Sequence, residues 1–417
     1  MERIVVVGGG AAGMMAAIAA AQAGARVLLL EKTDRLGFKI QISGGGRCNI
    51  TNDLDDPREL VKMYPSNGRF LSDAFRRFTK HDVLALLARH GVRTKVEAPY
   101  DKVFPVSDRS RDVILALEAE MKALGVEIRY ETPIAGLEIA HGRVTGVRTT
   151  DDHLITADAV IVCVGGRSLP RSGSTGDGYR MAEAAGHRVV DLYPSLVPLR
   201  VNGTKPLAGV SLKDVEGTVM VDGKVADRRW RGDMLFTHFG LSGPIVLQLS
   251  RAAAEGLHRS KAVELRLNLK PDLSAQEVES ELLARINAAP RSQVASLFKD
   301  DMPKSVIEPF LEAAGVEATK KVAELSRGDR QRLAETLRAW RFPVTGWHSF
   351  EVAEVTAGGV DTKEVDPKTF QSKLVKGLYW AGEVLDVDGY VGGFNFQAAW
   401  SSGHAAGTAA AEALLTR

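Results

Sequence analysis

The chain has 417 residues, 45% of them hydrophobic, and its 54 basic and 52 acidic residues give a formal net charge of +2. This length predicts two or three domains. The balanced charge argues against a nucleic acid or an anionic membrane as partner. The two cysteines, Cys48 and Cys163, form no C-x-x-C pair, which fits a reducing cytoplasm and excludes a cysteine zinc site. Neither histidine spacing nor apolar runs predict a metal site or a membrane span. We therefore expect a metal-free cytoplasmic protein and leave its oligomeric state open.

The first 31 residues predict a β-strand, a helix and a second β-strand. Ile4–Val7 is an apolar, β-branched run of the kind found in buried parallel strands. An alanine-rich helix should follow from about Ala11 to Ala23 and end at Gly24, before the strand Val27–Leu30. A signal peptide or membrane span is disfavoured because glycines interrupt the apolar run and no cleavage-type segment follows it.

The turn after the first strand carries the pattern G-x-G-x-x-G. Gly8 allows a tight turn, Gly10 lets the backbone approach a pyrophosphate, and Gly13 lets the helix pack on the strand. The helix N-terminus would hold the diphosphate through free N–H groups. Glu31 ends the second strand, where a carboxylate accepts hydrogen bonds from a ribose diol. Together these positions predict a dinucleotide site.

The rest of the chain predicts one nucleotide-binding domain interrupted by two inserts. Strand and helix patterns alternate up to about residue 190, including helical stretches near 70–90 and 112–124 and a hairpin at 134–148. Short alternating segments then indicate a small, mostly β region, and a capping box at Ser274–Glu277 opens helical residues to about 340. A final strand and a helix from about 394 to 415 restore the first pattern. We expect a doubly wound α/β domain over residues 1–193 and 350–417, a β-barrel-like insert over 194–273 and 341–349, and a helical insert over 274–340.

Two further segments favour a flavin over a nicotinamide cofactor. Three glycines at 44–46, flanked by Ser43 and Arg47, make a backbone that can wrap an anionic or flat ligand, although a flexible surface loop is the alternative. In the second segment, Glu383 follows a strand-end glycine, and Gly392-Gly393 opens the last helix. The N-terminus of that helix would face the flavin N1 and C2 carbonyl, which carry the negative charge of the reduced ring.

At these residues the sequence resembles the YhiN/BaiN-type family of FAD-dependent oxidoreductases, which includes the aminoacetone oxidases. The matching segments are VVVGGGAAGMMAA, SGGGRCNITN, DAVIVCVGGRSLPRSGSTGDGY, LFTHFGLSGP, AEVTAGGV and GLYWAGEVLDVDGYVGGFNFQAAWSSGHAAG. The resemblance implies that the N-terminal glycines hold the diphosphate, Glu31 the adenosine ribose, Ile134 the adenine and Glu383 the ribityl chain. One departure is Phe394-Asn395, where a Tyr-Asn pair is common in the family.

The expected cofactor-binding set combines the residue patterns with this resemblance. It comprises Gly8, Gly10, Ala11, Ala12, Gly13, Glu31, Lys32, Lys39, Ser43, Gly44, Gly45, Gly46, Arg47, Cys48, Asn49, Ile134, Gly165, Gly382, Glu383, Gly393, Phe394 and Asn395.

We expect hydride transfer between flavin N5 and a small organic substrate, an amine, a carbonyl or an enone. A non-catalytic FAD-binding sensor or scaffold is the alternative. No second strand–G-x-G-x-x-G–helix unit is found, so NADH, NADPH and oxygen all stay open as redox partners. His238 is the candidate catalytic acid, against the alternative of a histidine bonded by loop backbone. Cys48 is a reactive thiol or, more commonly for such a residue, a buried inert one. Tyr390 is predicted to point toward the ring.

Overall fold

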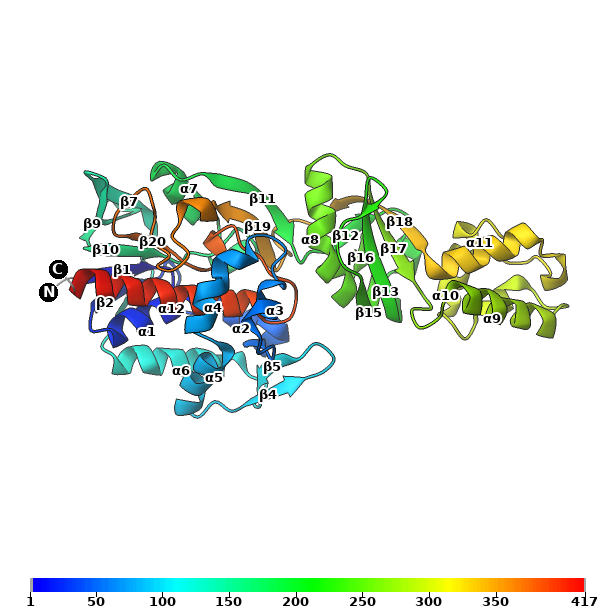
Figure 1. Cartoon of the computed structure of the whole chain (residues 1–417), viewed down its shortest axis with the longest axis horizontal. Coiled ribbons are helices and arrows are strands. Elements are labelled where there is room, and N and C mark those ends of the chain that lie inside the picture. The colour runs from blue at the N-terminus through cyan, green and yellow to red at the C-terminus, as the bar shows by residue number, and fades with distance from the viewer. Residues whose placement is uncertain (1–2, 416–417) are drawn as a thin grey trace. The chain divides into compact units, whose positions relative to one another are not determined.

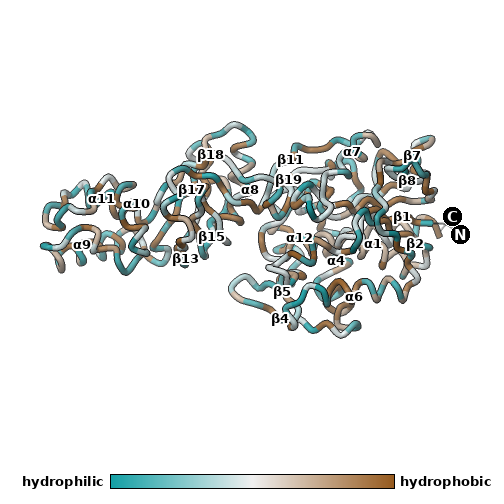
Figure 2. The backbone as a smooth tube through the Cα atoms, turned by 180° about the vertical axis from the view of Figure 1, so that it is seen from behind, coloured by the Kyte–Doolittle hydropathy of each residue, from teal (hydrophilic) through white to brown (hydrophobic). Residues whose placement is uncertain are grey.

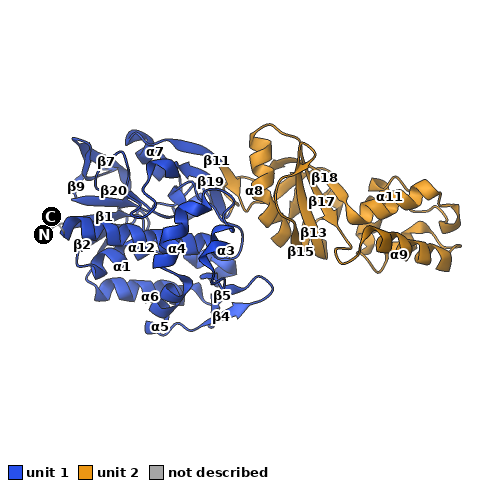
Figure 3. Cartoon of the chain, viewed as in Figure 1, with its two compact units in different colours: residues 1–192, 354–417 blue, residues 193–353 orange. Residues whose placement is uncertain are grey.

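The computed structural model describes residues 3–415, which form two compact units (Figure 3). The first contains Met1–Leu192 and Glu354–Arg417, and the second contains Tyr193–Ala353. The chain thus leaves the first unit once and returns to it. None of the helices in residues 3–415 is both long and apolar enough to cross a membrane.

A five-stranded parallel sheet forms the centre of the first unit (Figure 1). Its order is β20 (Leu378–Trp380), β10 (Ala159–Val162), β1 (Arg3–Val7), β2 (Arg26–Leu30) and β6 (Glu127–Arg129). Ile4, Val5 and Val6 are 0% exposed, and burying such side chains contributes about 1.5–3 kcal/mol each. Hydrophobic residues follow β1 and β2 in Figure 2, as expected for strands covered on both faces. The predicted α/β fold with a Rossmann-type parallel sheet is confirmed.

Two helices far apart in sequence pack side by side against this sheet. They are α1 (Ala11–Gln22) and α12 (Phe394–Leu415), close to the bounds predicted from the sequence. An ideal Cβ at Gly403 would lie 2.3 Å from the Ala12 carbonyl oxygen, and one at Gly407 would lie 2.3 Å from that of Ala16. Since both helix positions advance together by four residues, the two helices run parallel. Only glycine permits so close an approach of the two backbones.

The other elements of the first unit surround this core. Figure 1 shows α1 and α12 on one side of the sheet and the meander of β7, β8 and β9 on the other. The bounds are α2 (Phe38–Ile42), α3 (Pro57–Val61), α6 (Ser110–Ala123), α7 (Asp177–Ala184), β3 (Thr51–Asn52), β4 (Thr94–Glu97), β5 (Lys102–Pro105), β7 (Ile134–Ala140), β8 (Arg143–Thr149), β9 (Leu154–Thr156), β11 (Val189–Ser195) and β19 (Val355–Val360). Strand β11 pairs with β19 and continues into the second unit.

The helical stretch predicted near residues 70–90 consists of two helices. It is divided into α4 (Ser72–Arg77) and α5 (Lys80–Arg89). Phe78 has extended backbone, and Thr79 caps the second helix in a capping box with Asp82. A threonine three residues before an aspartate is a start signal for a helix, so the break was visible in the sequence.

The second unit is built on an antiparallel sheet that closes on itself. Its order is β14 (Lys224–Val225), β13 (Ser211–Val221), β15 (Trp230–Thr237), β16 (Gly240–Ser242), β12 (Leu199–Val201), β18 (Trp340–Trp347) and β17 (Val263–Asn268), with β13 also paired to β17. Three helices, α9 (Ala275–Ala288), α10 (Lys304–Ala313) and α11 (Arg327–Arg338), lie between β17 and β18 in the chain. We retain the three-part domain division predicted from the sequence as a proposal.

Helix α8 (Pro244–His258) is the helical part of the region that the sequence predicted to be mostly β. Proline lacks a backbone N–H, and the first position of a helix does not need one. Pro244 at that position therefore favours a helix start. Ile245, Leu249 and Ala253, spaced four residues apart, are all 0% exposed.

Candidate cofactor site

Four of the predicted site residues follow strands of the parallel sheet. Gly8 follows β1, Glu31 follows β2, Gly165 lies just beyond β10, and Gly382 lies just beyond β20. The carboxyl ends of parallel strands meet at one edge, where ligands bind in open α/β sheets. The fold therefore gathers residues from four separate parts of the sequence along one edge.

The glycine turn has the geometry that its spacing predicts. Gly8 has φ +100°, and a Cβ there would lie 2.6 Å from the Cys163 carbonyl oxygen. A Cβ at Gly13 would lie 1.8 Å from the Gly8 carbonyl oxygen, so the helix could not pack on the strand with any other residue. A Cβ at Gly10 would meet nothing within 4 Å. Gly10 also provides no side-chain cap for α1, whose first turn contains no acid. The N-terminus of α1, which includes Ala11 and Ala12, is thus open to an anion.

Glu31 is 8% exposed and lies beside this turn. Its carboxylate accepts hydrogen bonds from the Gly9 N–H (2.7 Å) and from the Thr33 N–H and hydroxyl (both 2.8 Å). Three of the four lone-pair sites of the carboxylate are therefore occupied, and one site on Oε2 remains for a ribose hydroxyl. These bonds fix the carboxylate next to the diphosphate turn, as a ribose contact requires.

The parallel packing of α1 and α12 sets the distance between their N-termini. Gly403 faces Ala12, close to the start of α1, but lies well inside α12, which begins at Phe394. At a rise of about 1.5 Å per residue, α12 starts about 12 Å beyond the start of α1 in the same direction. The two positive helix ends are therefore offset by this distance along parallel axes, a spacing that suits a diphosphate at one end and an anionic ring at the other.

Lys39 in α2 and Glu383, which follows β20, form an ion pair. The Lys39 Nζ lies 2.6 Å from Glu383 Oε2, and Glu383 Oε1 accepts a hydrogen bond from the Thr356 N–H at 2.9 Å. The Thr356 hydroxyl in turn accepts from the N–H groups of Arg167 and Ser168. Thr356 thus fixes both Glu383 and the loop after Gly165. Sequence analysis missed Thr356 as a functional residue, although it lies in the AEVTAGGV segment.

The three-glycine bend keeps left-handed backbone, with φ of 56°, 71° and 86° at Gly44, Gly45 and Gly46. A Cβ at Gly45 would meet nothing within 4 Å, and one at Gly46 would meet only the Gln41 carbonyl oxygen at 4.0 Å. This open backbone leaves room for a ligand. The Ser43 hydroxyl donates to the Ile40 carbonyl oxygen and does not point freely outward.

Cys48 next to this bend is 0% exposed. Burial raises the pKa of its thiol to about 12, so it is protonated at neutral pH. Of the two interpretations left open by the sequence, the structure therefore favours the buried, inert thiol.

Asn49 and Asn395 hold the turn before α12. With its amide oriented to satisfy both partners, Asn49 accepts a hydrogen bond from the Gly393 N–H (2.8 Å) and donates to the Thr51 carbonyl oxygen (3.0 Å). The Asn395 amide makes two hydrogen bonds of 2.8 Å with the backbone of Gly389. Both side chains therefore fix the backbone around Phe394.

Other predicted site residues make contacts within the protein. Lys32 pairs with Asp177 at 2.6 Å. Arg47 pairs with Glu97 at 3.0 Å, and its guanidinium lies 4.0 Å from the centre of the Phe104 ring. Ile134 begins β7, opposite Thr149 in β8. Their contacts with a cofactor stay predictions.

His238 belongs to the second unit, in the turn between β15 and β16, and is exposed. Its ring meets the edge of Phe239, with 4.9 Å between ring centroids. Its role as an acid stays a prediction. Residues 3–415 contain no group of three His, Cys, Asp or Glu side chains that could hold a metal.

Comparisons with known proteins identify related proteins for nearly the whole chain. The family described as HI0933-like protein Rossmann domain matches residues 2–409. The chain is 33% identical over 422 residues to the 3-dehydro-bile acid delta(4,6)-reductase of Clostridium scindens, covering 99% of this chain and 100% of that protein. It is 34% identical over 394 residues to the ribosomal RNA dihydrouridine synthase of Escherichia coli, covering 92% and 91%.

Among solved structures, the 3-ketosteroid delta1-dehydrogenase of Sterolibacterium denitrificans has a similar fold. The TM-score is 0.54 at 15% identity, covering 99% of this chain and 100% of that one. At that identity the similarity concerns the fold alone. The family match and the two relatives confirm the resemblance predicted from the sequence, FAD as the cofactor, and a flavin-dependent oxidoreductase as the class of protein.

Proposed function

Because the chain belongs to the HI0933-like family of FAD-binding Rossmann proteins, we propose that it reduces a carbon–carbon double bond conjugated with a carbonyl group. When bound, FAD supplies a hydride from N5. The double bond gains that hydride on one carbon and a proton on the other, and NADH or NADPH restores the two electrons. We retain His238 as the proton donor in this proposal.

The names of two relatives support this reaction. A 3-dehydro-bile acid delta(4,6)-reductase and a dihydrouridine synthase both saturate a carbon–carbon double bond conjugated with a carbonyl. The sequence left amines, carbonyls and enones open as substrates. The shared chemistry of these names favours the enone class.

The offset N-termini of α1 and α12 are the observation that carries the proposal. The first binds the diphosphate through its uncapped N–H groups. The second places positive dipole where the reduced ring is negative, which stabilises the form of the cofactor that donates hydride. Glu31 binds the adenosine ribose. The Lys39–Glu383 pair borders the ribityl chain of FAD, between the diphosphate and the ring.

We propose a small molecule as substrate and a cytoplasmic location, the latter because both cysteines are buried and unpaired. A uridine of ribosomal RNA is the second candidate, since a relative 34% identical is named for it.

Anaerobic reduction of the purified holoprotein tests the proposal. The flavin is reduced with NADH, NADPH or dithionite and then mixed with a 3-oxo-Δ4 steroid, a simple enone, uridine or a ribosomal RNA fragment. Return of the oxidised flavin spectrum without oxygen, together with a saturated product, is the expected result. Reoxidation by a uridine-containing RNA alone would select the second candidate. A flavin that none of these compounds reoxidises would contradict the reductase and favour the sensor or scaffold.

A further inference from the structure

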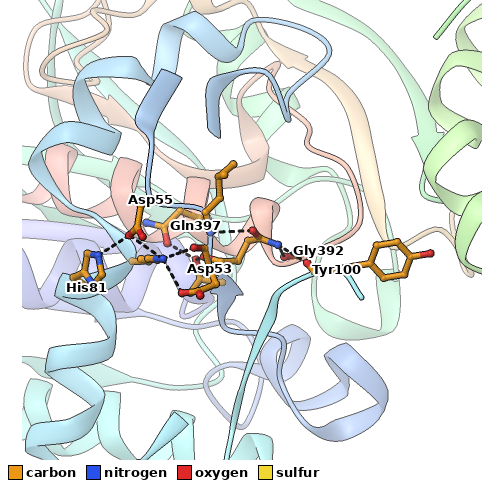
Figure 4. Close-up of polar contacts among 10 residues, drawn as sticks. Asp53, Asp55, His81, Tyr100, Gly392 and Gln397 are labelled. Carbon is orange, nitrogen blue, oxygen red and sulfur yellow. Dashed lines mark hydrogen bonds and ion pairs between the residues drawn. The ribbon is translucent and has the colours of Figure 1, made fainter. Parts of the chain in front are cut away.

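The peptide bond between Gly392 and Gly393 is held at both ends by one short segment. The Asn49 amide oxygen accepts from the Gly393 N–H at 2.8 Å. The Asn52 Nδ2 donates to the Gly392 carbonyl oxygen at 3.1 Å (Figure 4). One asparagine therefore holds the N–H and the other holds the carbonyl of the same peptide, immediately before α12.

All the hydrogen-bonding atoms of the Asn52 side chain are engaged. Its Nδ2 also donates to the Tyr100 carbonyl oxygen at 2.8 Å, and its Oδ1 accepts from the Leu54 N–H at 3.1 Å. The residue is 7% exposed. A buried amide with three backbone partners fixes the orientation of each, because losing any one leaves a polar group unsatisfied.

The segment that carries these asparagines is itself anchored. The Thr51 hydroxyl donates to Gln397 Oε1 at 2.6 Å, in the first turn of α12. Downstream, the buried Lys80 pairs with Asp53 at 2.7 Å and with Asp55 at 2.9 Å (Figure 4). Glycine is required at position 393, since a Cβ there would lie 2.4 Å from the Thr51 carbonyl oxygen. We call Asn49 and Asn52, together with the Gly392–Gly393 peptide that they hold, the clamp. These contacts keep the clamp from moving freely relative to α12.

The clamp fixes the orientation of the Gly392–Gly393 peptide dipole, immediately before α12. The first helical hydrogen bond runs from Gln397 N–H to the Gly393 carbonyl oxygen at 3.0 Å. The N–H groups of Phe394, Asn395 and Phe396 lie ahead of it and have no intrahelical partner. Because the Gly392 carbonyl is turned toward Asn52, its dipole does not oppose them. If that peptide rotated, a negative oxygen would be free to enter the same region.

We propose that Asn52 is a positioning residue that raises the reduction potential of the bound flavin by fixing the Gly392–Gly393 peptide. This inference rests on the FAD site of the proposed function. Reduction adds two electrons and one proton to the ring and leaves a negative charge near N1. The clamp keeps donors, and excludes a carbonyl oxygen, where that charge develops.

Hydrogen exchange on the wild-type protein tests the clamp without any substitution. The Gly393 amide is expected to be protected equally in the FAD-free and FAD-bound protein, because Asn49 holds it in both. The amides of Phe394–Phe396 are expected to gain protection only with FAD. A Gly393 amide that exchanges freely until FAD binds would overturn the clamp, since it would then face the cofactor.

Asn52→Leu tests the effect on the flavin, with Gln371→Leu as a matched control. Gln371 lies in the same unit, and its amide donates to the Tyr379 hydroxyl at 3.0 Å and not to the turn before α12. We expect the ratio of dissociation constants for reduced and oxidised FAD to rise about tenfold in Asn52→Leu, equal to a potential about 30 mV lower for a two-electron couple. The control should keep the wild-type potential. An unchanged potential in a folded, flavin-loaded Asn52→Leu would overturn the proposal.

A second variant covers the case in which Asn52→Leu does not fold. Asn52→Ala removes the donor without adding a charge or bulk, so it should also lower the potential. Failure of the inference is distinguishable from failure of the proposed function. Wild-type protein that takes up no FAD would contradict the function, whereas a flavin-loaded wild type with a freely exchanging Gly393 amide would contradict the clamp alone.

Discussion

Gly403 of α12 lies against Ala12 of α1 so closely that a Cβ at position 403 would be 2.3 Å from the Ala12 carbonyl oxygen. This contact sets both the parallel course of the two helices and the offset of their N-termini. Gly403→Val should therefore destabilise the first unit by about 1–3 kcal/mol through overpacking, and FAD affinity should fall with it. Urea unfolding and a flavin titration measure the two effects. Gly136→Ala is the control, because a Cβ there meets nothing within 4 Å. Equal effects of the two substitutions would contradict the packing argument.

Glu31→Ala should weaken FAD binding about 10- to 100-fold, since a hydrogen bond to a charged group contributes about 1.5–3 kcal/mol. Equilibrium dialysis with FAD measures this. Asp34→Ala, an exposed aspartate paired only with its neighbour Arg35, should leave the affinity unchanged. Full flavin occupancy in Glu31→Ala at micromolar FAD would remove the ribose assignment.

Lys39→Met should lower both thermal stability and FAD affinity, because it leaves the largely buried Glu383 carboxylate without its cation. In the double variant Lys39→Met/Glu383→Gln, part of the stability should return while FAD affinity stays low. Thermal unfolding without FAD, followed by a flavin titration, separates the two effects. Full recovery of FAD affinity in the double variant would show that the pair serves stability alone.

Stability should fall as the pH drops below about 6.5, the ordinary pKa of histidine. Burial lowers the pKa of His187, which contacts Glu364, Ser372 and Trp380, and burial also lowers that of His404. Because the folded state holds these rings neutral, the unfolded state binds more protons as the pH falls, and stability is lost. Urea unfolding between pH 5 and 8 measures the slope. A smaller slope in His187→Gln is expected, and an identical slope would assign the effect to other groups.

Cys48 should resist alkylation at pH 8 in the folded protein, since burial raises the pKa of its thiol to about 12. Iodoacetamide labelling followed by mass spectrometry should modify it only after unfolding. Rapid labelling in the native state would contradict the buried, inert assignment and restore the reactive thiol.

Local sequence patterns predicted the parts of the site that depend on neighbouring residues. The strand before Gly8, the helix that begins at Ala11 and the carboxylate at Glu31 all follow from spacing within one βαβ unit. The final helix was predicted with the same bounds, Phe394–Leu415, that the structure gives it. Backbone requirements of glycine turns and helices act over a few residues, so the sequence reveals them.

Partners of polar side chains could not be predicted in this way. Asn52 bonds the carbonyl of Gly392, and Lys39 pairs with Glu383, although each pair lies more than 300 residues apart in the sequence. Lys32, expected beside the cofactor, pairs with Asp177 instead of standing free. The Asn52 and Lys39 contacts depend on how the segment after residue 353 packs on the rest of the first unit, which no local pattern records.

A crystal structure of the protein with FAD measures the central claim most directly, through the distance from the flavin C2 carbonyl oxygen to the nearest first-turn N–H of α12. We predict a hydrogen bond of about 2.7–3.2 Å, with the diphosphate at the N-terminus of α1. A structure in which the adenine occupies the end near Phe394, or in which the ring lies away from α12, would contradict the account.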